Sequence, residues 1–185
     1  MSSAATQAGP VRRARHRVVT GFLTLIILAL IAMWVYAFGF ASKEGINIVG
    51  DKTWTVRAEQ ICAEAQRERF ALADYRKLED AGPDALAGRA AIIEKANGIL
   101  ARMVDDLGAT LPTDAKGEHV ISAWLADYRT YLADRVDYVE TLRRTGDNVP
   151  FHETVISGEP ISNYLGDVAR QNRMTSCQAP LDLAG

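Results

Sequence analysis

The chain has 185 residues, of which 21 are Lys or Arg and 23 are Asp or Glu, so its formal net charge is −2. Four arginines precede an uncharged stretch at residues 18–40, whereas all 23 acidic residues follow it. The part after that stretch therefore has 17 basic and 23 acidic residues, a net charge of about −6, which argues against nucleic acid as a partner.

Residues 18–40 predict a transmembrane helix. This run of 23 residues contains no Asp, Glu, Lys, Arg or His, and at about 1.5 Å per residue it reaches roughly 34 Å, enough to cross a bilayer. Basic residues beside a span stay in the cytoplasm, so we expect a cytoplasmic basic tail at residues 1–17 and an extracytoplasmic remainder. The lipid bilayer is the first expected partner, and the cell membrane the expected location.

A cleaved secretory signal peptide is the competing interpretation of the same stretch. Gly39 and Ala41 are small residues at the −3 and −1 positions of a possible cleavage site, but the apolar run is longer than the usual span of about 7 to 15 residues. Aromatic residues at its outer end, including Trp34 and Tyr36, suit a lipid–water interface. These features favour a retained anchor.

Residues 41–52 predict a linker, and residues 53–185 predict one all-α domain. Apolar residues recur at helical spacing in three long segments, separated by Gly and Pro residues. The expected long helices cover residues 53–80, 84–108 and 113–146. Short connections between them favour antiparallel neighbours in a helical bundle.

The third long helix has an apolar face wider than a coiled-coil seam, which favours packing within one bundle over an intermolecular coiled coil. The oligomeric state is left open. Residues 147–159 lack a helical period and predict a long loop. Pro160 then opens a short helix, and the tail after Cys177 is expected to be extended.

Two cysteines, Cys62 and Cys177, lie outside the membrane in this topology. Extracytoplasmic thiols in an even number usually pair, and closing so long a loop stabilises by up to about 4 to 5 kcal/mol in the chain-entropy model. Metal binding is the alternative, but the histidines have no metal-ligand spacing, and His16 precedes the span. We predict a Cys62–Cys177 disulfide, no metal and no cofactor.

Sequence motifs of catalysis are missing: the chain has no nucleophile elbow, phosphate-binding loop, dinucleotide fingerprint or EF-hand loop. Paired acidic residues fall on the solvent faces or ends of the expected helices. We therefore predict no catalytic residue. His152 and Glu153, in the long loop, are candidates for a ligand or partner contact because loops often carry function.

Further candidates lie on the third long helix. A guanidinium in its apolar row needs a carboxylate or several carbonyls, so Arg135 either caps a buried network or faces a ligand or partner. The aromatic row beside it forms either a core stripe or a recognition strip. That row consists of Trp124, Tyr128, Tyr131 and Tyr138.

Several segments of the ectodomain follow a familiar pattern. They include Ile61-Cys62-Ala63, the run WLADYRTYLADRVDYVETLR, and the closing Cys177 with Pro180-Leu181-Asp182-Leu183. With these segments the chain resembles an uncharacterised group of actinobacterial single-pass membrane proteins. The resemblance implies an anchor, a helical ectodomain and a terminal cysteine, and it brings neither an activity nor a functional residue.

These observations lead to three expectations for function. The first is a membrane-tethered, non-enzymatic interaction or accessory protein that works with another protein of the cell envelope. The second is an extracytoplasmic module that binds or senses a small solute between helices. The third is an extracytoplasmic enzyme, for which His152 and Glu153 are the best candidates.

Overall fold

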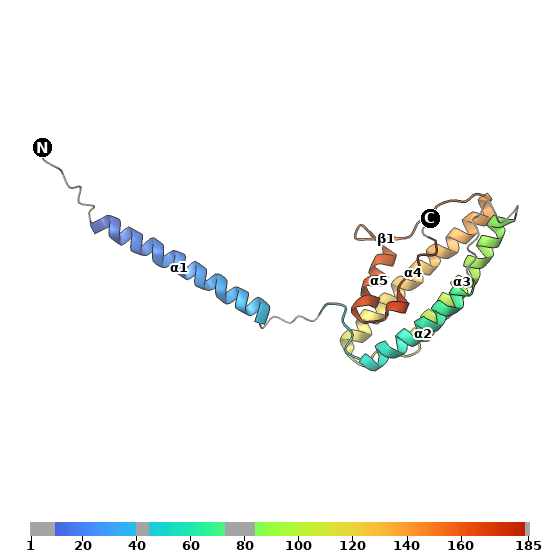
Figure 1. Cartoon of the computed structure of the whole chain (residues 1–185), viewed down its shortest axis with the longest axis horizontal. Helices are drawn as coiled ribbons and strands as arrows, with labels where there is room; N and C mark the ends of the chain where they lie inside the picture. The colour runs from blue at the N-terminus through green and yellow to red at the C-terminus, as the bar shows by residue number, and fades with distance from the viewer. Residues whose placement is uncertain (1–9, 40–44, 73–83, 184–185) are drawn as a thin grey trace. The chain divides into compact units, whose positions relative to one another are not determined.

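The computed structural model describes residues 10–39, 45–72 and 84–183. The chain forms two compact units, Met1–Glu44 and Gly45–Gly185 (Figure 1). In the first unit, helix α1 covers Pro10–Gly39. Its segment Val19–Phe38 has a mean hydropathy of 2.4 and no buried side chain, so it is long and apolar enough to cross a membrane.

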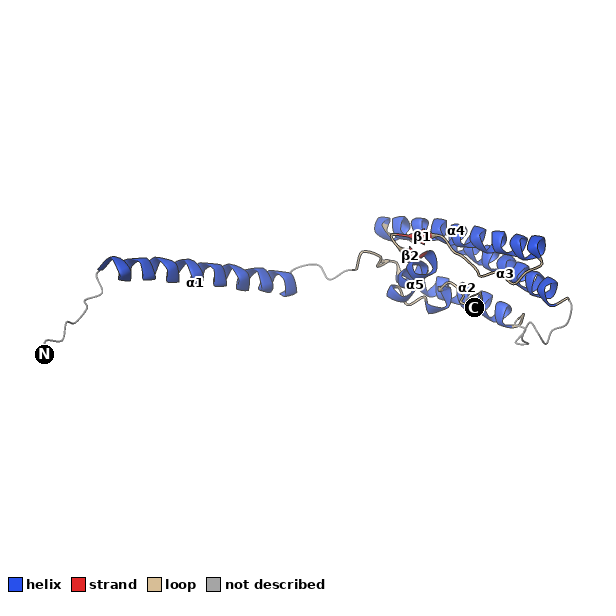
Figure 2. Ribbon diagram, turned by 90° about the horizontal axis from the view of Figure 1, so that it is seen from above, coloured by secondary structure: helices blue, strands red, loops and turns tan. Residues whose placement is uncertain are grey.

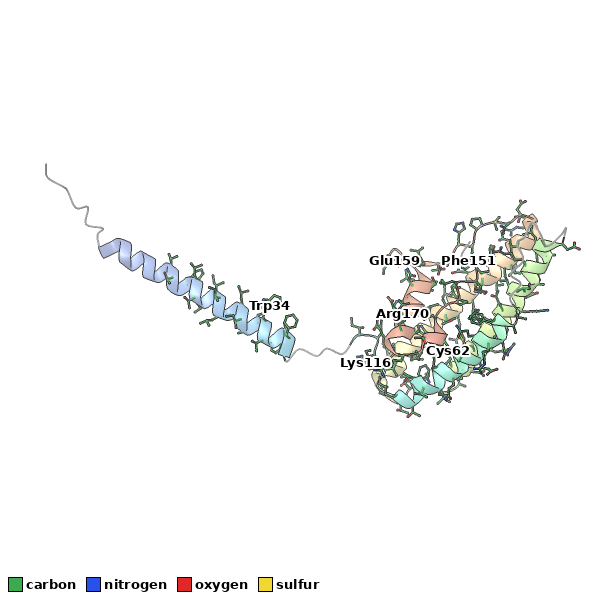
Figure 3. All side chains as sticks on the ribbon, viewed as in Figure 1. Trp34, Cys62, Lys116, Phe151, Glu159 and Arg170 are labelled. Atoms are coloured by element: carbon green, nitrogen blue, oxygen red, sulfur yellow. A yellow bond between two sulfur atoms is a disulfide. The ribbon has the colours of Figure 1, made fainter. Side chains whose placement is uncertain are left out.

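Helix α1 begins earlier than the apolar run does. The predicted tail at residues 1–17 is helical from Pro10 onward, because proline suits the first position of a helix and the following arginines are good helix formers. At the other end of the run, the ring of Trp34, which is labelled in Figure 3, stacks on that of Phe38 with the centroids 5.1 Å apart.

The second unit confirms the predicted all-α fold. Its long helices are α2 (Lys52–Phe70), α3 (Ala85–Gly108) and α4 (Ala115–Thr145), and its short helix is α5 (Ile161–Gln171). A 3₁₀ helix follows at Thr175–Cys177. Helix α2 ends at Phe70 with a turn at residues 71–72, and the remainder of the helix predicted to reach residue 80 lies outside the described residues.

The helices pack side by side because each has one apolar face. On α4 the buried residues recur at intervals of three and four, from Ile121 to Leu142, and Gly146 ends the helix with a left-handed φ of 70°. Helix α3 packs against both α2 and α4, while α5 packs against α4 (Figure 2).

A β-hairpin with strands of two residues each begins within the predicted loop at residues 147–159. Strand β1 (Val155–Ile156) pairs antiparallel with β2 (Glu159–Pro160). Between them Ser157 and Gly158 have φ angles of 53° and 88°, as a tight two-residue turn requires. Both residues of β1 are exposed, so no alternation of apolar and polar residues marks the hairpin in the sequence.

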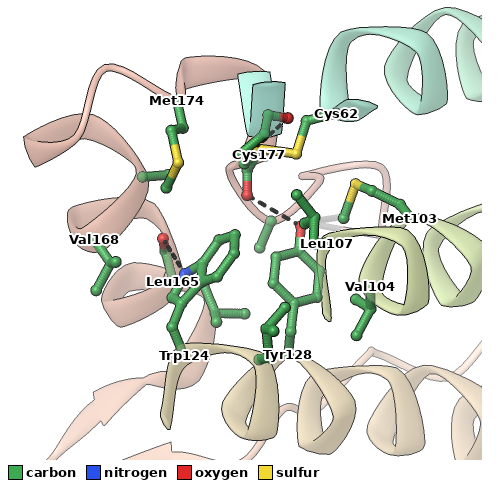
Figure 4. Packing of buried hydrophobic residues seen from close by; sticks show 14 of the residues in the cluster. Cys62, Met103, Val104, Leu107, Trp124, Tyr128, Leu165, Val168, Met174 and Cys177 are labelled. Atoms are coloured by element: carbon green, nitrogen blue, oxygen red, sulfur yellow. Dashed lines mark hydrogen bonds between the residues drawn. A yellow bond between two sulfur atoms is a disulfide. The ribbon is translucent and has the colours of Figure 1, made fainter. Parts of the chain in front are cut away.

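Two clusters of buried side chains form the core of the second unit. The larger, which we call the disulfide core, joins α2, α3, α4, α5 and the 3₁₀ helix around Cys62, Trp124 and Tyr128 (Figure 4). The smaller, which we call the distal core, contains Ala90, Ile93, Tyr138, Val139, Leu142 and Leu183.

The predicted disulfide is present in the larger core. Cys62 and Cys177 are fully buried and bonded to each other, across 115 residues of sequence. Cys62 belongs to α2 and Cys177 closes the 3₁₀ helix, so the bond holds the start of the C-terminal tail against α2 (Figure 4).

The starts of α2 and α4 hold each other through reciprocal caps. Asp51 accepts from the amide of Trp54 at 2.9 Å and from that of Thr113 at 3.1 Å. Asp114 accepts from the amide of Gly117 at 2.7 Å and from that of Asp51 at 2.9 Å. These hydrogen bonds lower the pKa of both carboxyl groups.

The segment before α2 is held by a buried asparagine. The side chain of Asn172 accepts from the amide of Val49 at 2.8 Å and donates to the carbonyls of Asn47 at 2.7 Å and Val168 at 2.9 Å. Residues 47–49 are thereby fixed to the end of α5.

Candidate functional site: a trough between the tail and the long loop

Arg135 is the centre of a buried network. Its guanidinium is fully buried and forms a bidentate salt bridge with Asp182, which lies 47 residues away in the tail. Nη1 donates to Oδ1 at 2.7 Å and Nη2 donates to Oδ2 at 3.0 Å. Its Nε donates to Asn97 at 2.6 Å, and Nη1 donates to the hydroxyl of Tyr131 at 3.3 Å. Of the two alternatives from the sequence, the structure shows the buried network.

The electrostatics of this network favour an ionised Asp182. Burial raises the pKa of its carboxyl group, but the hydrogen bonds and charge of Arg135, with the charge of Arg69, outweigh burial and leave that pKa below its usual value. The side chain of Asp182 is 37% exposed, so water shares in its solvation. Arg69 lies 4.0 Å from the same carboxylate, and burial lowers its own pKa.

The aromatic row on α4 is buried, and its polar atoms hold other segments in place. Trp124 donates to the carbonyl of Leu165 at 3.1 Å, and Tyr131 donates to that of Pro180 at 2.9 Å. The hydroxyl of Tyr128 lies 3.3 Å from the carbonyl oxygens of Cys177 and Gln178 (Figure 4). Burial raises the pKa of Tyr128, so this hydroxyl remains a donor.

The C-terminal tail consequently runs parallel to α4. Successive contacts advance along both segments together: Tyr128 with Cys177 and Gln178, Tyr131 with Pro180, and Arg135 with Asp182. Leu183 then packs beside Tyr138 in the distal core. The tail lies along about three turns of helix with one side-chain contact per turn.

The long loop runs along α4 in the opposite direction. Tyr138 donates to the carbonyl of Val149 at 3.1 Å, and Asp134 accepts from the amide and hydroxyl of Thr154 at 2.7 Å and 3.0 Å. Phe151, which is labelled in Figure 3, makes edge contacts with the rings of Tyr131 and Tyr138, at centroid distances of 6.1 Å and 5.5 Å.

Between these two segments lies a hollow of about 470 Å³, which we call the trough. Tyr131 and Tyr138 line its base, where they are only 1% and 6% exposed, and we call this base the floor. Residues 148–151 form one wall, and the tail forms the other with Pro180, Leu181 and Leu183. Each wall is tied to the floor by one tyrosine hydroxyl, and Leu181 is 78% exposed at the rim. The aromatic row thus supplies a floor as well as a core.

Charged groups of opposite sign also line the trough. Arg89, from the first turns of α3, is half-buried and makes no hydrogen bond or ion pair with any described residue. Glu153 accepts from the amide and hydroxyl of Ser162 at 2.8 Å and 3.0 Å, and thereby caps the start of α5. Each oxygen of Glu153 accepts one hydrogen bond and keeps capacity for another.

The candidates from the sequence have different positions in this site. Tyr131 and Glu153 line the trough, whereas Arg135 lies beside it, in the network that holds the tail. Trp124 and Tyr128 are in the disulfide core. His152 is exposed and makes no hydrogen bond or ion pair with a described residue.

Sequence reasoning did not single out Arg89 or the tail wall, and it included the loop wall only as part of the long loop at residues 147–159. Arg89 is one charged residue among several on an expected helix, and the walls have no period that a pattern would reveal. Within the described residues, no group of three or more His, Cys, Asp or Glu is arranged to hold a metal ion.

Comparisons with known proteins find no matching family, no significant match among curated proteins and none among solved structures. The resemblance to the actinobacterial group therefore stays a prediction.

Proposed function

We propose that this chain is a single-pass membrane protein, with a cytoplasmic N-terminus and an extracytoplasmic domain that works by binding and performs no catalysis. The trough is its binding site. Another protein of the cell envelope presents or receives what the trough binds, and the bilayer holds the domain at the site of action.

The membrane location draws support from α1 and the disulfide. The segment Val19–Phe38 has the length and hydropathy of a span, and the arginines before it favour a cytoplasmic N-terminus. A structural disulfide is typical of proteins folded in an oxidising compartment, in agreement with an outside position for residues 45–185.

The observation that carries the proposal is the construction of the trough. Its volume of about 470 Å³ falls within the usual range for ligand sites, roughly 300 to 1,000 Å³. Both walls are irregular segments, and a side-chain hydrogen bond attaches each of them to the rigid helix α4. Binding loops are usually supported by a rigid scaffold in this way.

Binding fits the acidic groups of the site better than catalysis. Glu153 accepts two hydrogen bonds from Ser162, and Asp134 accepts two from Thr154, so both carboxylates position the loop. A general base takes up a proton from a substrate, whereas these contacts give both carboxylates a positioning role. The second expectation from the sequence, a binding module, is therefore favoured over the enzyme.

A photo-crosslinking amino acid placed in the full-length protein in its own membrane tests this function. At Leu181, on the rim of the trough, we expect a discrete cross-linked product. The matched control is Val56, an apolar residue of α2 that is 60% exposed and does not line the trough. Equal products from both positions, or none from Leu181, would contradict binding in the trough.

External protease tests the topology. Added to intact cells, it is expected to remove the part beyond residue 44 and to leave α1 protected in the membrane. Protection of the ectodomain, or its release into the medium without protease, would contradict the anchored arrangement.

A further inference from the structure

We infer that one end of the second unit docks on a phospholipid surface, with the side chain of Ile46 inserted below the headgroups and Arg173 on the lipid phosphates. The lipid is that of the bilayer which holds α1, so the inference rests on the membrane-anchored arrangement proposed above. It does not involve the trough.

Three segments that are far apart in the sequence meet at this end, which we call the docking end. They are residues 45–53, 113–119 and 171–173. The ammonium group of Lys116 donates to the carbonyl of Gly45 at 3.1 Å, and the side chain of Asn172 accepts from the amide of Val49 at 2.8 Å. Together with the reciprocal caps of α2 and α4, these hydrogen bonds make the docking end one firm surface.

The length of the chain keeps the docking end close to the bilayer. The candidate span ends at Phe38, and Gly45 follows seven residues later. A chain covers at most about 3.6 Å per residue, so this connection reaches no farther than roughly 25 Å. The docking end is therefore within easy reach of the lipid headgroups.

Ile46 is displayed in a way that suits insertion into lipid. Its side chain is 86% exposed, more than that of any other large apolar residue described. It lies in a turn that the amide of Ile48 closes on the carbonyl of Gly45 at 3.2 Å, and such turns favour Gly, Pro, Asn, Asp and Ser. Asn47 is fixed through its carbonyl to Asn172 at 2.7 Å. A rigid turn thus holds an apolar side chain in water, and lipid would remove that surface from water.

Arg173 suits the phosphate groups. It follows α5 with a left-handed φ of 59°, at a position where glycine is usual because it bears no strain there. The amide of Met174 closes the same turn on the carbonyl of Ala169 at 2.8 Å. The side chain of Arg173 is exposed and makes no hydrogen bond or ion pair with a described residue. A guanidinium offers parallel donors that match phosphate oxygens.

The docking end also differs in charge from the rest of the second unit. Residues 45–185 contain 16 basic and 22 acidic residues, a net charge of −6, whereas the docking end has three of each. Two of its acids, Asp51 and Asp114, accept hydrogen bonds from backbone amides, which leaves Glu118 as the third. An acidic surface is repelled by lipid phosphates, so this balanced end is the one that suits contact with them.

Fluorescence quenching of the full-length protein in phospholipid nanodiscs tests the inference. A fluorescent amino acid replaces Ile46, whose exposure means that no core packing is lost. The nitroxide quencher is carried on the lipid acyl chain near the glycerol in one set of discs and on the headgroup in the other. We expect the acyl-chain nitroxide to quench more strongly, because an inserted side chain lies below the headgroups.

The matched control places the same fluorescent residue at Leu181, which is 78% exposed. The neighbouring Pro180 bonds to Tyr131, and Tyr131 is 17 residues, or about 26 Å, beyond Asp114 along α4. We expect neither nitroxide to quench the fluorescence at this position.

Arg173→Gln tests the contact with phosphate, with the fluorescent residue at position 46. The ratio of docked to undocked protein should fall about fivefold, the usual contribution of one basic residue at an anionic lipid surface. Glutamine has a side chain on the same left-handed backbone, so the strain is retained. Arg144→Gln is the control at the other end of α4, where Arg144 is exposed, and it should change nothing.

Three outcomes would overturn the inference: stronger quenching of position 46 by the headgroup nitroxide, equal quenching at positions 46 and 181, or equal effects of Arg173→Gln and Arg144→Gln. Failure here, with α1 still protected from external protease, would reject the docking alone. Failure of the protease experiment as well would reject the anchored arrangement on which the docking rests.

Discussion

The disulfide core and the distal core are closed by different means. Around Cys62 and Cys177, helices and the 3₁₀ helix enclose a fully buried covalent bond. Around Tyr138 and Leu142, by contrast, irregular segments complete the core, and only noncovalent contacts hold them, such as the Arg135–Asp182 pair and the hydrogen bond from Tyr138 to Val149. The difference places the covalent restraint at one end of the second unit and leaves the other end dependent on noncovalent contacts.

The largest expected effect is on the disulfide core. Replacing Cys62 and Cys177 together by alanine should lower the free energy of unfolding of residues 45–185 by about 4 to 5 kcal/mol, because the bond restricts a loop of more than 100 residues in the unfolded chain. Urea unfolding followed by the fluorescence of the buried Trp124 measures it. A loss below about 1 kcal/mol would show that the two cores do not differ in this way.

The Arg135–Asp182 pair joins the two cores, and breaking it should have the next largest effect. Arg135→Met leaves Asn97 without its donor and Asp182 without its counter-ion, at a cost of about 3 kcal/mol in unfolding free energy. The double variant Arg135→Met, Asp182→Asn should regain part of that loss, since it removes the carboxylate that Arg135 leaves unpaired, and the regain is only partial because Arg69 then loses its own counter-ion. Equal stability of the single and double variants would contradict an ionic role for Asp182.

Acid should weaken the same pair. The folded-state pKa of Asp182 is depressed, so its contribution is fully present above the ordinary value of 3.8 and is lost as pH falls through the lower folded-state pKa. Stability measured between pH 5 and pH 2 should therefore fall less steeply in Asp182→Asn than in the unaltered protein. Identical slopes would mean that Asp182 is not held ionised by Arg135.

The smallest expected effect concerns the wall of the trough. Tyr138→Phe removes the hydrogen bond to Val149 and should cost about 1 kcal/mol of unfolding free energy. Hydrogen exchange should quicken at residues 148–151 and stay unchanged around Cys177. Tyr164→Phe is the control, because the Tyr164 hydroxyl makes no hydrogen bond with a described residue. Equal effects of both changes would remove the special role of Tyr138.

Regular patterns made much of this fold predictable. Helical periods and Gly or Pro breaks located α3 and α4 to within a few residues, and two cysteines permitted only one intramolecular pairing. The hairpin at residues 155–160 was missed because it is too short and too exposed to show a period.

The candidate site was only partly predictable, because long-range partners leave no local pattern. A buried guanidinium requires a carboxylate, so the environment of Arg135 could be anticipated, but nothing in the sequence selected Asp182 among 23 acidic residues. The trough depends on two aperiodic segments that meet on α4. Of its charged residues, Glu153 was already a candidate from the sequence, whereas Arg89 became recognisable only when those segments were placed.

The hydrogen bonds of Asn172, together with the reciprocal caps of Asp51 and Asp114, have a mechanical consequence. The chain that comes from α1 joins the bundle at residues 47–51, and these side chains fasten it to the end of α5 and the start of α4. A pull on the chain before residue 47 is therefore delivered to the end of the second unit that the disulfide reinforces. The walls of the trough take no part in these hydrogen bonds, so they carry none of this load directly.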